Sequence, residues 1–287
     1  MSDTMRVGLA QMNTQSDKEA NLRRAEELID EAAARGARLV VLPEYVSFLG
    51  PREQHEEVAE PIPGPTTERF AAKARQHGIW LHGGSIHERS DTPGMYYNTS
   101  VVFDPSGEII ATYRKIHLFD IDLTGNVTAN ESSTILPGDE VVTVDIDGHR
   151  VGLSICYDLR FPELYRQLAL AGAEVLLVPA AFTMFTGKDH WHVLLRARAI
   201  ENQTWVLAPG QFGAHELNAQ CYGHSVIIDP WGTVVADAPN GEGVIVADLD
   251  FDALRKIRAQ LPSLANRRPS AYPVSYTHLT LPTSDLV

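Results

Sequence analysis

The sequence predicts an α/β fold built from two similar halves. Apolar runs of strand length alternate with segments of helical periodicity, and one part of the chain repeats. Segments 100–110 and 225–235 match position by position around Asp-Pro-x-Gly, and Trp80 and Trp205 are separated by the same interval. Asp-Pro-x-Gly between two apolar runs is typical of a hairpin turn. We therefore expect one antiparallel hairpin in each half.

Two further pairs of apolar runs support the two halves. Val-Gly-Leu occurs at 7–9 and 151–153, and the runs 39–43 and 175–179 both end in proline. Their residues are apolar at successive positions, as expected for strands buried on both faces. Because the spacing between matched runs changes, the repeat belongs to one fold with insertions and does not indicate a solenoid.

Helical patterns follow these strands. Ser16, with Glu19 three residues later, predicts a capping box at a helix start. The apolar positions after it share one helical face, and they are Leu22, Ala25, Leu28, Ile29 and Ala32. Segments 66–77, 161–171 and 189–203 have similar patterns. Each strand–helix–strand passage is long enough for a crossover between parallel strands.

Composition excludes several classes of protein. The 287 residues carry a formal net charge of −13, which opposes nucleic-acid binding. No apolar run is long enough to cross a membrane, and residues 1–6 show no secretory signal pattern. Only two cysteines are present, which favours a reducing compartment over a disulfide framework. We expect a cytoplasmic protein without nucleic-acid or membrane partners.

Cys156 is a candidate nucleophile. It ends the apolar run 151–155 and is followed by a segment that begins a helix, Asp158 to Glu163. A thiol at such a corner is expected to be exposed, with a low pKa, near backbone N–H groups that can meet an anion. Taken alone, the residue is equally compatible with a small buried hydrophobic side chain.

Two other runs end in ionisable residues. Glu44 follows the run 39–43, and Lys115 follows an extended run that contains Tyr113. Because the carboxyl ends of parallel strands meet at one edge, Glu44, Lys115 and Cys156 are expected to converge in one crevice.

Together these three segments resemble the nitrilase (carbon–nitrogen hydrolase) superfamily, whose triad is Glu-Lys-Cys. The resemblance extends from 7–11 to 266–269, and segments 113–120 and 187–191 resemble the Nit-type branch of omega-amidases and deaminated-glutathione amidases. It implies a four-layer α-β-β-α sandwich, a single carbon–nitrogen hydrolase domain over 1–273, and a homodimer or higher homo-oligomer.

The residue types suggest a mechanism for amide hydrolysis. Glu44 is the candidate base, Cys156 attacks the amide carbon, and Lys115 with the Tyr157 backbone N–H stabilises the oxyanion. Ammonia leaves, and water then hydrolyses the thioester. The resemblance adds Glu131, which would orient Lys115 and keep it charged; the alternative is a solvated loop carboxylate.

Other residues are candidates for binding a small amide substrate. Tyr45, Phe182 and Met184 are expected to line the pocket, although Phe182 and Met184 are equally compatible with a core role. The branch that the chain resembles acts on carboxylated amides, and Arg160 and Lys188 are candidate cations for the carboxylate. The alternative for Arg160 is an ion pair with Asp158 or Glu163 at the helix start. A nitrilase, an N-carbamoyl amino acid amidohydrolase and an inactive scaffold on the same fold remain alternative functions.

No metal or cofactor is expected. His190 and His192 are two residues apart, so on a helix they point to different faces and do not form a metal pair. The glycine pairs lack the third glycine of a dinucleotide fingerprint.

The C-terminal segment 274–287 is treated separately. It is rich in threonine, lacks a helical or strand pattern, and resembles translated vector or adapter sequence. We expect a non-native or disordered tail, and the alternative is a native tail that closes a dimer.

Overall fold

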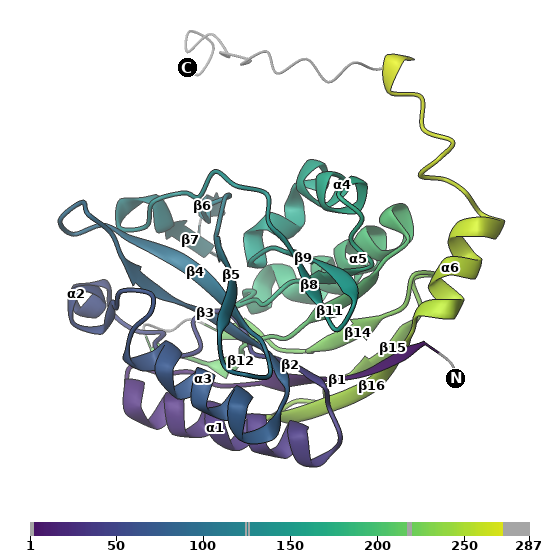
Figure 1. Ribbon diagram of the computed structural model, residues 1–287. Helices are drawn as coiled ribbons and strands as arrows, with labels where there is room; N and C mark the ends of the chain where they lie inside the picture. Colours follow the sequence, from purple (N-terminus) through teal and green to yellow (C-terminus); the bar gives the residue numbers. More distant parts are fainter. Residues whose placement is uncertain (1–2, 124, 126, 217–219, 272–287) are drawn as a thin grey trace, which may run out of the picture.

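Two six-stranded sheets form the centre of the molecule, with helices on their outer faces (Figure 1). The computed structural model describes residues 3–123, 125, 127–216 and 220–271. The first sheet contains β1 (Thr4–Gln11), β2 (Leu39–Val41), β3 (Trp80–Arg89), β4 (Tyr96–Phe103), β5 (Ile109–Arg114) and β16 (Gly243–Asp250). The second contains β8 (Thr143–Ile146), β9 (His149–Leu153), β10 (Val175–Leu177), β11 (Trp205–Ala208), β14 (Val226–Ile228) and β15 (Val234–Asp237).

The strand order confirms the two similar halves. The first sheet is ordered β16-β1-β2-β3-β4-β5, and the second, read from its other edge, β8-β9-β10-β11-β14-β15. In each sheet three central strands are parallel, β1-β2-β3 and β9-β10-β11, and the neighbouring pairs are antiparallel. The matched sequence runs thus occupy equivalent strands.

Helices cover both outer faces and complete the four-layer α-β-β-α sandwich. Helices α1 (Lys18–Ala34) and α3 (Pro65–His77) pack on the first sheet, and α4 (Pro162–Leu170) and α5 (Met184–Asn202) on the second (Figure 1). The other elements are α2 (His55–Val58), α6 (Phe251–Gln260), β6 (Asp120–Leu123), β7 (Val127–Asn130), β12 (Phe212–Ala214), β13 (Gln220–Tyr222), and the 3-10 helices η1 (Arg52–Gln54), η2 (Glu131–Ser133), η3 (Cys156–Arg160) and η5 (Pro269–Ala271).

Strand β1 contributes side chains to two different core clusters. Val7 and Leu9 belong to the core cluster between the sheets, whereas Ala10 packs with residues of α1. This alternation follows from the two-residue period of a strand. The positions from Val7 to Gln11 are therefore all buried, in agreement with the apolar run at 7–10.

The glycine of each Val-Gly-Leu run permits close helix packing. A Cβ atom at Gly8 would lie 2.9 Å from the Ala32 Cβ atom of α1, and one at Gly152 would lie 3.0 Å from the Leu168 Cβ atom of α4. The repeated glycine therefore reflects the same contact between strand and helix in both halves.

The predicted hairpin turns are confirmed. Asp104 accepts hydrogen bonds from the backbone N–H groups of Ser106 and Glu108, and Asp229 accepts the equivalent bonds from Trp231 and Thr233. Each aspartate thus fixes the turn that joins β4 to β5 or β14 to β15.

Two predicted helix starts are wrong. Asp17, not Ser16, caps α1, because its carboxylate accepts the Ala20 N–H while the Ser16 hydroxyl bonds to Glu216. Helix α5 begins at Met184, earlier than the predicted residue 189. Gly187 concealed this start, since glycine disfavours helices. Its position is explained by packing, because a Cβ atom there would lie 2.4 Å from the Tyr222 Cβ atom.

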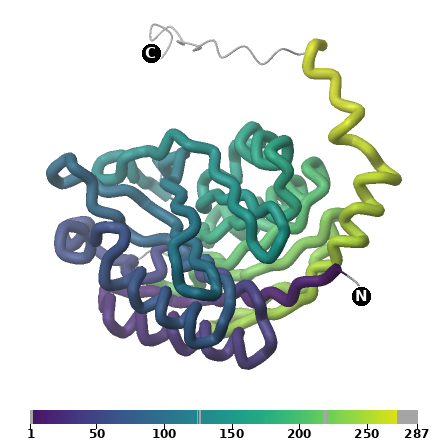
Figure 2. The backbone as a smooth tube through the Cα atoms, viewed as in Figure 1, coloured from purple at the N-terminus to yellow at the C-terminus, as the bar shows by residue number. Residues whose placement is uncertain are grey.

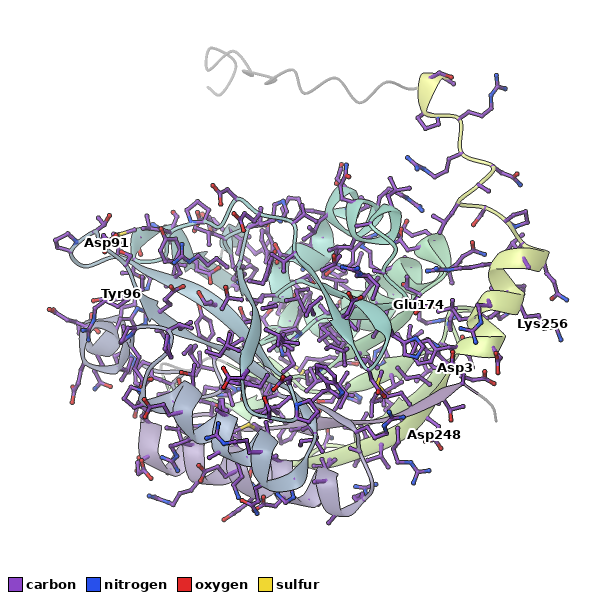
Figure 3. The ribbon with its side chains drawn as sticks, viewed as in Figure 1. Asp3, Asp91, Tyr96, Glu174, Asp248 and Lys256 are labelled. Carbon is purple, nitrogen blue, oxygen red and sulfur yellow. The ribbon has the colours of Figure 1, made fainter. Side chains whose placement is uncertain are left out.

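Labelled residues mark two opposite ends of the molecule (Figure 3). Figure 3 places Asp91 and Tyr96 at the end where α2, β6 and β7 cluster, and Asp3, Glu174, Asp248 and Lys256 at the opposite end. After α6 the chain leaves the body of the molecule (Figure 2). The tail predicted for 274–287 lies outside the described residues, so that prediction and the domain limit at 273 are untested. Among the described helices, none is long and apolar enough to cross a membrane.

Candidate active site

The strands of both sheets deliver ionisable groups to one place. Glu44 follows β2, Lys115 directly follows β5, and Cys156 begins η3 just after β9. The Lys115 Nζ atom lies 3.0 Å from the Glu44 Oε1 atom, and all three side chains line one cavity. The structure thus brings together the three residues that the sequence singled out.

Glu44 is held by donors from both halves of the fold. Its Oε1 atom accepts from Asn98 Nδ2 at 2.8 Å and from Lys115 Nζ, and its Oε2 atom accepts the Ala181 backbone N–H at 2.7 Å. Glu44 is only 1% exposed. These contacts keep the carboxylate in one orientation inside a largely dry site.

Glu131 forms the second anchor of Lys115. The Lys115 Nζ atom donates to both Glu131 carboxylate oxygens, at 3.0 and 2.9 Å, and Tyr45 and the Phe119 N–H also donate to this carboxylate. Burial lowers the pKa of Lys115, but the charges of Glu131 and Glu44 outweigh it and raise this pKa well above its usual range. Burial raises the pKa of Glu131, yet Lys115 brings it below its ordinary value. Glu131 is therefore no solvated loop carboxylate.

Cys156 differs from the sequence expectation in two respects. Its side chain is buried, with 8% exposure, and burial raises the pKa of the thiol well above its usual range. The Glu44 carboxylate raises this pKa further, by its charge and by a hydrogen bond to the thiol. The expected exposed, low-pKa thiol is therefore wrong, because a carboxylate and apolar walls surround the sulfur. To act as a nucleophile, such a thiol would need a neighbouring base to remove its proton.

The backbone at Cys156 is a sharp corner. The residue has a φ of 47°, in the left-handed region that few non-glycine residues adopt. Its N–H donates to the Pro179 carbonyl at 2.9 Å, which joins the corner to the end of β10. Tyr157 is the second residue of η3, where early backbone N–H groups lack partners within the helix. This strained turn fixes the sulfur at the cavity wall.

Asp158 connects this corner to the segment that carries Lys115. Its buried carboxylate accepts from Tyr113 Oη at 2.7 Å, from the His117 N–H at 3.0 Å and from the Ile155 N–H at 2.8 Å. Tyr113 and His117 lie on either side of Lys115 in the chain. One carboxylate therefore ties the Cys156 corner to the Lys115 segment.

The candidate site encloses a cavity of about 340 Å³. Tyr45, Tyr157 and Phe182 line it, as does Cys221, the second cysteine. Helix α5 begins at Met184, so Thr183 and Thr186 lie on the face toward the cavity. Met184 and Lys188 fall on other faces and are not in the lining that the described residues form, contrary to expectation.

Arg160 is also outside this lining. Its guanidinium packs against the rings of Tyr157 and Phe182 and lies 3.3 Å from the His190 Nδ1 atom. Lys188 is 58% exposed and lies 3.8 Å from Asp189. Neither cation that the sequence suggested for a substrate carboxylate faces the cavity.

Sequence reasoning missed many residues of the site, and four of them bear on its chemistry. Asn98, which binds Glu44, lies inside an apolar strand and carries no motif. Arg52, His55 and His87 line the cavity from η1, α2 and β3. The His87 ring stacks on Tyr45 with centroids 4.7 Å apart. Only the spacing of Asn98 in the hairpin that leads to Lys115 could have suggested a role.

A separate histidine cluster lies outside the cavity lining. His192 Nε2 and His224 Nδ1 each lie 2.9 Å from a different oxygen of Asp237, and the three side chains are close enough to hold a metal ion. His190 is not part of this group, in agreement with the spacing argument. Because one carboxylate already pairs with both imidazoles, these contacts are explained without an ion.

Comparisons with known proteins agree with this geometry. Residues 6–259 match the family model described as carbon-nitrogen hydrolase. A deaminated glutathione amidase from Synechocystis is 45% identical over 90% of this chain and 96% of its own length. The human omega-amidase NIT2 is 41% identical over 94% of this chain and 98% of its own. The crystal structure of Saccharomyces cerevisiae Nit3, titled a member of branch 10 of the nitrilase superfamily, superposes with a TM-score of 0.82 at 35% identity, covering 90% of this chain and 94% of that one.

Fold and site together define an enzyme of the amidase class, which hydrolyses a carbon–nitrogen bond. The chain belongs to the carbon–nitrogen hydrolase family, within the nitrilase superfamily.

Proposed function

We propose that this amidase works through a thioester on Cys156, with Glu44 as the base and Lys115 as the oxyanion partner. One observation carries the proposal: a carboxylate, an ammonium and a thiol line one cavity, and the carboxylate lies 3.0 Å from the ammonium. A structural role alone would not require three ionisable groups in a largely dry place, where each costs desolvation free energy.

In the first half of the reaction the thiol proton moves to Glu44. The sulfur forms a bond to the amide carbon, and the carbonyl oxygen gains negative charge. Lys115 and the Tyr157 backbone N–H stabilise this oxyanion. The tetrahedral intermediate collapses, the carbon–nitrogen bond breaks, and Glu44 returns the proton to the leaving nitrogen as ammonia departs.

The second half regenerates the enzyme. Glu44 takes a proton from water, and the hydroxide attacks the thioester carbon. Lys115 and Tyr157 again stabilise the oxyanion. Collapse of this intermediate breaks the carbon–sulfur bond, and the proton returns to the Cys156 sulfur. The products are a carboxylic acid and ammonia. Glu131 keeps Lys115 charged and oriented throughout.

The substrate is proposed to be a small amide that carries a carboxylate. The named activities of the similar proteins, deaminated glutathione amidase and omega-amidase, support this class. The cavity of about 340 Å³ suits a ligand of this size. A nitrilase or an N-carbamoyl amino acid amidohydrolase would use the same triad and remains an outcome of the test.

The test is a substrate panel with a matched pair of cysteine variants. Deaminated glutathione, 2-oxoglutaramate, an N-carbamoyl amino acid and a simple nitrile are each incubated with the wild type, and products are identified by mass spectrometry. Cys156→Ala should retain less than about a few per cent of activity, whereas Cys221→Ala, which changes the other cysteine of the cavity, should retain most of it.

Three results would contradict the proposal. Turnover of only the nitrile or only the N-carbamoyl compound would assign another substrate class. Substantial activity in Cys156→Ala would remove the proposed nucleophile. No turnover of any substrate of the panel by the wild type would favour an inactive scaffold protein.

We also propose a homodimer or higher homo-oligomer in a reducing compartment such as the cytoplasm. Val193 and Ile200 are 66% and 47% exposed and lie two turns apart on α5. Ile200 lies beside Gly232, next to Trp231, which is 61% exposed. Such an apolar face on one surface is suited to pairing with its own copy. The two free cysteines of the cavity support the reducing compartment.

A further inference from the structure

The cavity contains one cation that the proposed mechanism does not use. Its charged lining residues are Glu44, Lys115, Glu131 and Arg52, within the part of the chain that the structure describes. Lys115 is engaged by both carboxylates. Arg52 is the remaining charge, and it comes from η1, outside both sheets.

Arg52 is oriented toward the catalytic loop. Its Nη1 atom donates to the Ser133 hydroxyl at 2.7 Å, and Ser133 ends η2, the short helix that begins at Glu131. Among the described residues, no carboxylate lies within ion-pair distance of this guanidinium. Arg52 contributes to lowering the pKa of Asp120, but Asp120 does not line the cavity. Most of the guanidinium donors therefore remain available to a ligand.

Two imidazoles line the same cavity as Arg52 and the triad. His55 and His87 line the cavity with ring centroids 4.4 Å apart, and His87 stacks on Tyr45, whose hydroxyl donates to Glu131. Burial lowers the pKa of both histidines, and Arg52 contributes to this at His55. Both rings are therefore neutral at pH 7, which leaves Arg52 as the charge that distinguishes this wall of the cavity.

We propose that Arg52 binds the substrate carboxylate remote from the scissile amide. This inference rests on the proposed function and names the residue that recognises the negative charge of the substrate carboxylate. A guanidinium presents a planar fork that matches a carboxylate. With a protein net charge of −13, the overall field repels an anionic ligand, so a local cation is needed for selectivity. Ser133 acts as a positioning residue, because its hydroxyl accepts a hydrogen bond from the guanidinium and orients it.

The test compares two amides of equal chain length, glutaramate and pentanamide, which differ in the terminal carboxylate. Kinetics are measured for the wild type, Arg52→Gln, Arg52→Lys and Ser133→Ala. The controls, Arg160→Gln and Lys188→Gln, remove the same charge from positions outside the described lining.

Arg52→Gln should raise KM for glutaramate about tenfold or more, with kcat and all constants for pentanamide nearly unchanged. Arg52→Lys should recover part of the loss, Ser133→Ala should show a smaller rise in KM, and the two controls should match the wild type. The unchanged pentanamide reaction also shows that each variant is folded.

Two outcomes would overturn the assignment: an equal effect of Arg52→Gln on both amides, or a selective loss in Arg160→Gln or Lys188→Gln instead. Failure of the proposed function is distinguishable, because the wild type would then hydrolyse neither amide. Wild-type turnover without any preference for glutaramate would contradict the carboxylate proposal while leaving the amidase intact.

Discussion

At the scale of single residues, the proposed chemistry depends on the pairing of Glu44 with Cys156. A high thiol pKa at rest is compatible with nucleophilic catalysis when a base lies within hydrogen-bond reach. The same carboxylate that would activate the thiol also raises its pKa, because its negative charge opposes formation of a thiolate. The two effects of Glu44 can therefore be separated by experiment.

Glu44→Gln should change catalysis and thiol acidity in opposite senses. Loss of the base should lower kcat by about a hundredfold or more. Loss of the negative charge should lower the pKa of Cys156, so its alkylation by iodoacetamide should become fast at a lower pH than in the wild type. The measurement is the pH profile of alkylation in a Cys221→Ala background, so that only Cys156 reacts.

An unchanged or upward-shifted alkylation profile would show that Glu44 does not interact with the thiol. A normal kcat in Glu44→Gln would show that another group is the base.

The sequence located the triad because each member follows an apolar run at a strand end. Asn98 and Arg52 could not be found in this way. Asn98 is a buried amide inside a strand, and Arg52 reaches the cavity from the short helix η1, whose position depends on tertiary packing. The prediction that Arg160 and Lys188 face the cavity was wrong. A position close to Cys156 in the sequence, or within α5, does not determine to which side of a helix the side chain points.

At the scale of elements, the apolar patterns predicted the helices well and their starts less well. Segment 66–77 differs by one residue from α3. The start of α1 depends on which of two adjacent polar side chains reaches the free N–H groups, and both Ser16 and Asp17 are good caps. The start of α5 depends on where β10 ends and on the packing of Gly187 against Tyr222. Neither feature can be recognised from the sequence around residue 184.

The cap assignment predicts a difference in stability between two neighbouring variants. Asp17→Ala should lower the free energy of unfolding by about 1 kcal/mol, because the Ala20 N–H loses its acceptor. Ser16→Ala should change it by less than about 0.5 kcal/mol, since its hydroxyl bonds only to a surface glutamate. Chemical denaturation of both variants measures the two values, and a larger loss in Ser16→Ala would restore the sequence-based capping box.

At the scale of the whole molecule, the two-sheet architecture makes the site possible. Glu44 and Lys115 come from the first half, Cys156 and Ala181 from the second, and the sheets face one another so that their strand ends meet. The repeated turn and the matched apolar runs predicted the two halves. The face-to-face stacking was implied only by family resemblance, because a periodic pattern does not specify which layers pack together.

The proposed oligomer also belongs to this scale. Val193→Glu should convert the wild-type oligomer to monomers, because it places a charge in the exposed apolar face of α5. Val141→Glu is the control, since Val141 is likewise 48% exposed but lies in the segment before β8. Size-exclusion chromatography with light scattering measures the mass. A monomeric wild type, or an unchanged mass in Val193→Glu, would contradict the proposal.

The central claim is a covalent thioester on Cys156, and direct detection of this species tests it best. The wild type, Cys156→Ala and Cys221→Ala are each mixed with an amide that the wild type hydrolyses. The reactions are quenched in acid within the first turnovers and analysed by intact-protein and peptide mass spectrometry. We predict an added acyl group on the peptide that contains Cys156, present in the wild type and in Cys221→Ala and absent in Cys156→Ala. An acyl group on Cys221, or full turnover with no adduct on Cys156 at any quench time, would contradict the account.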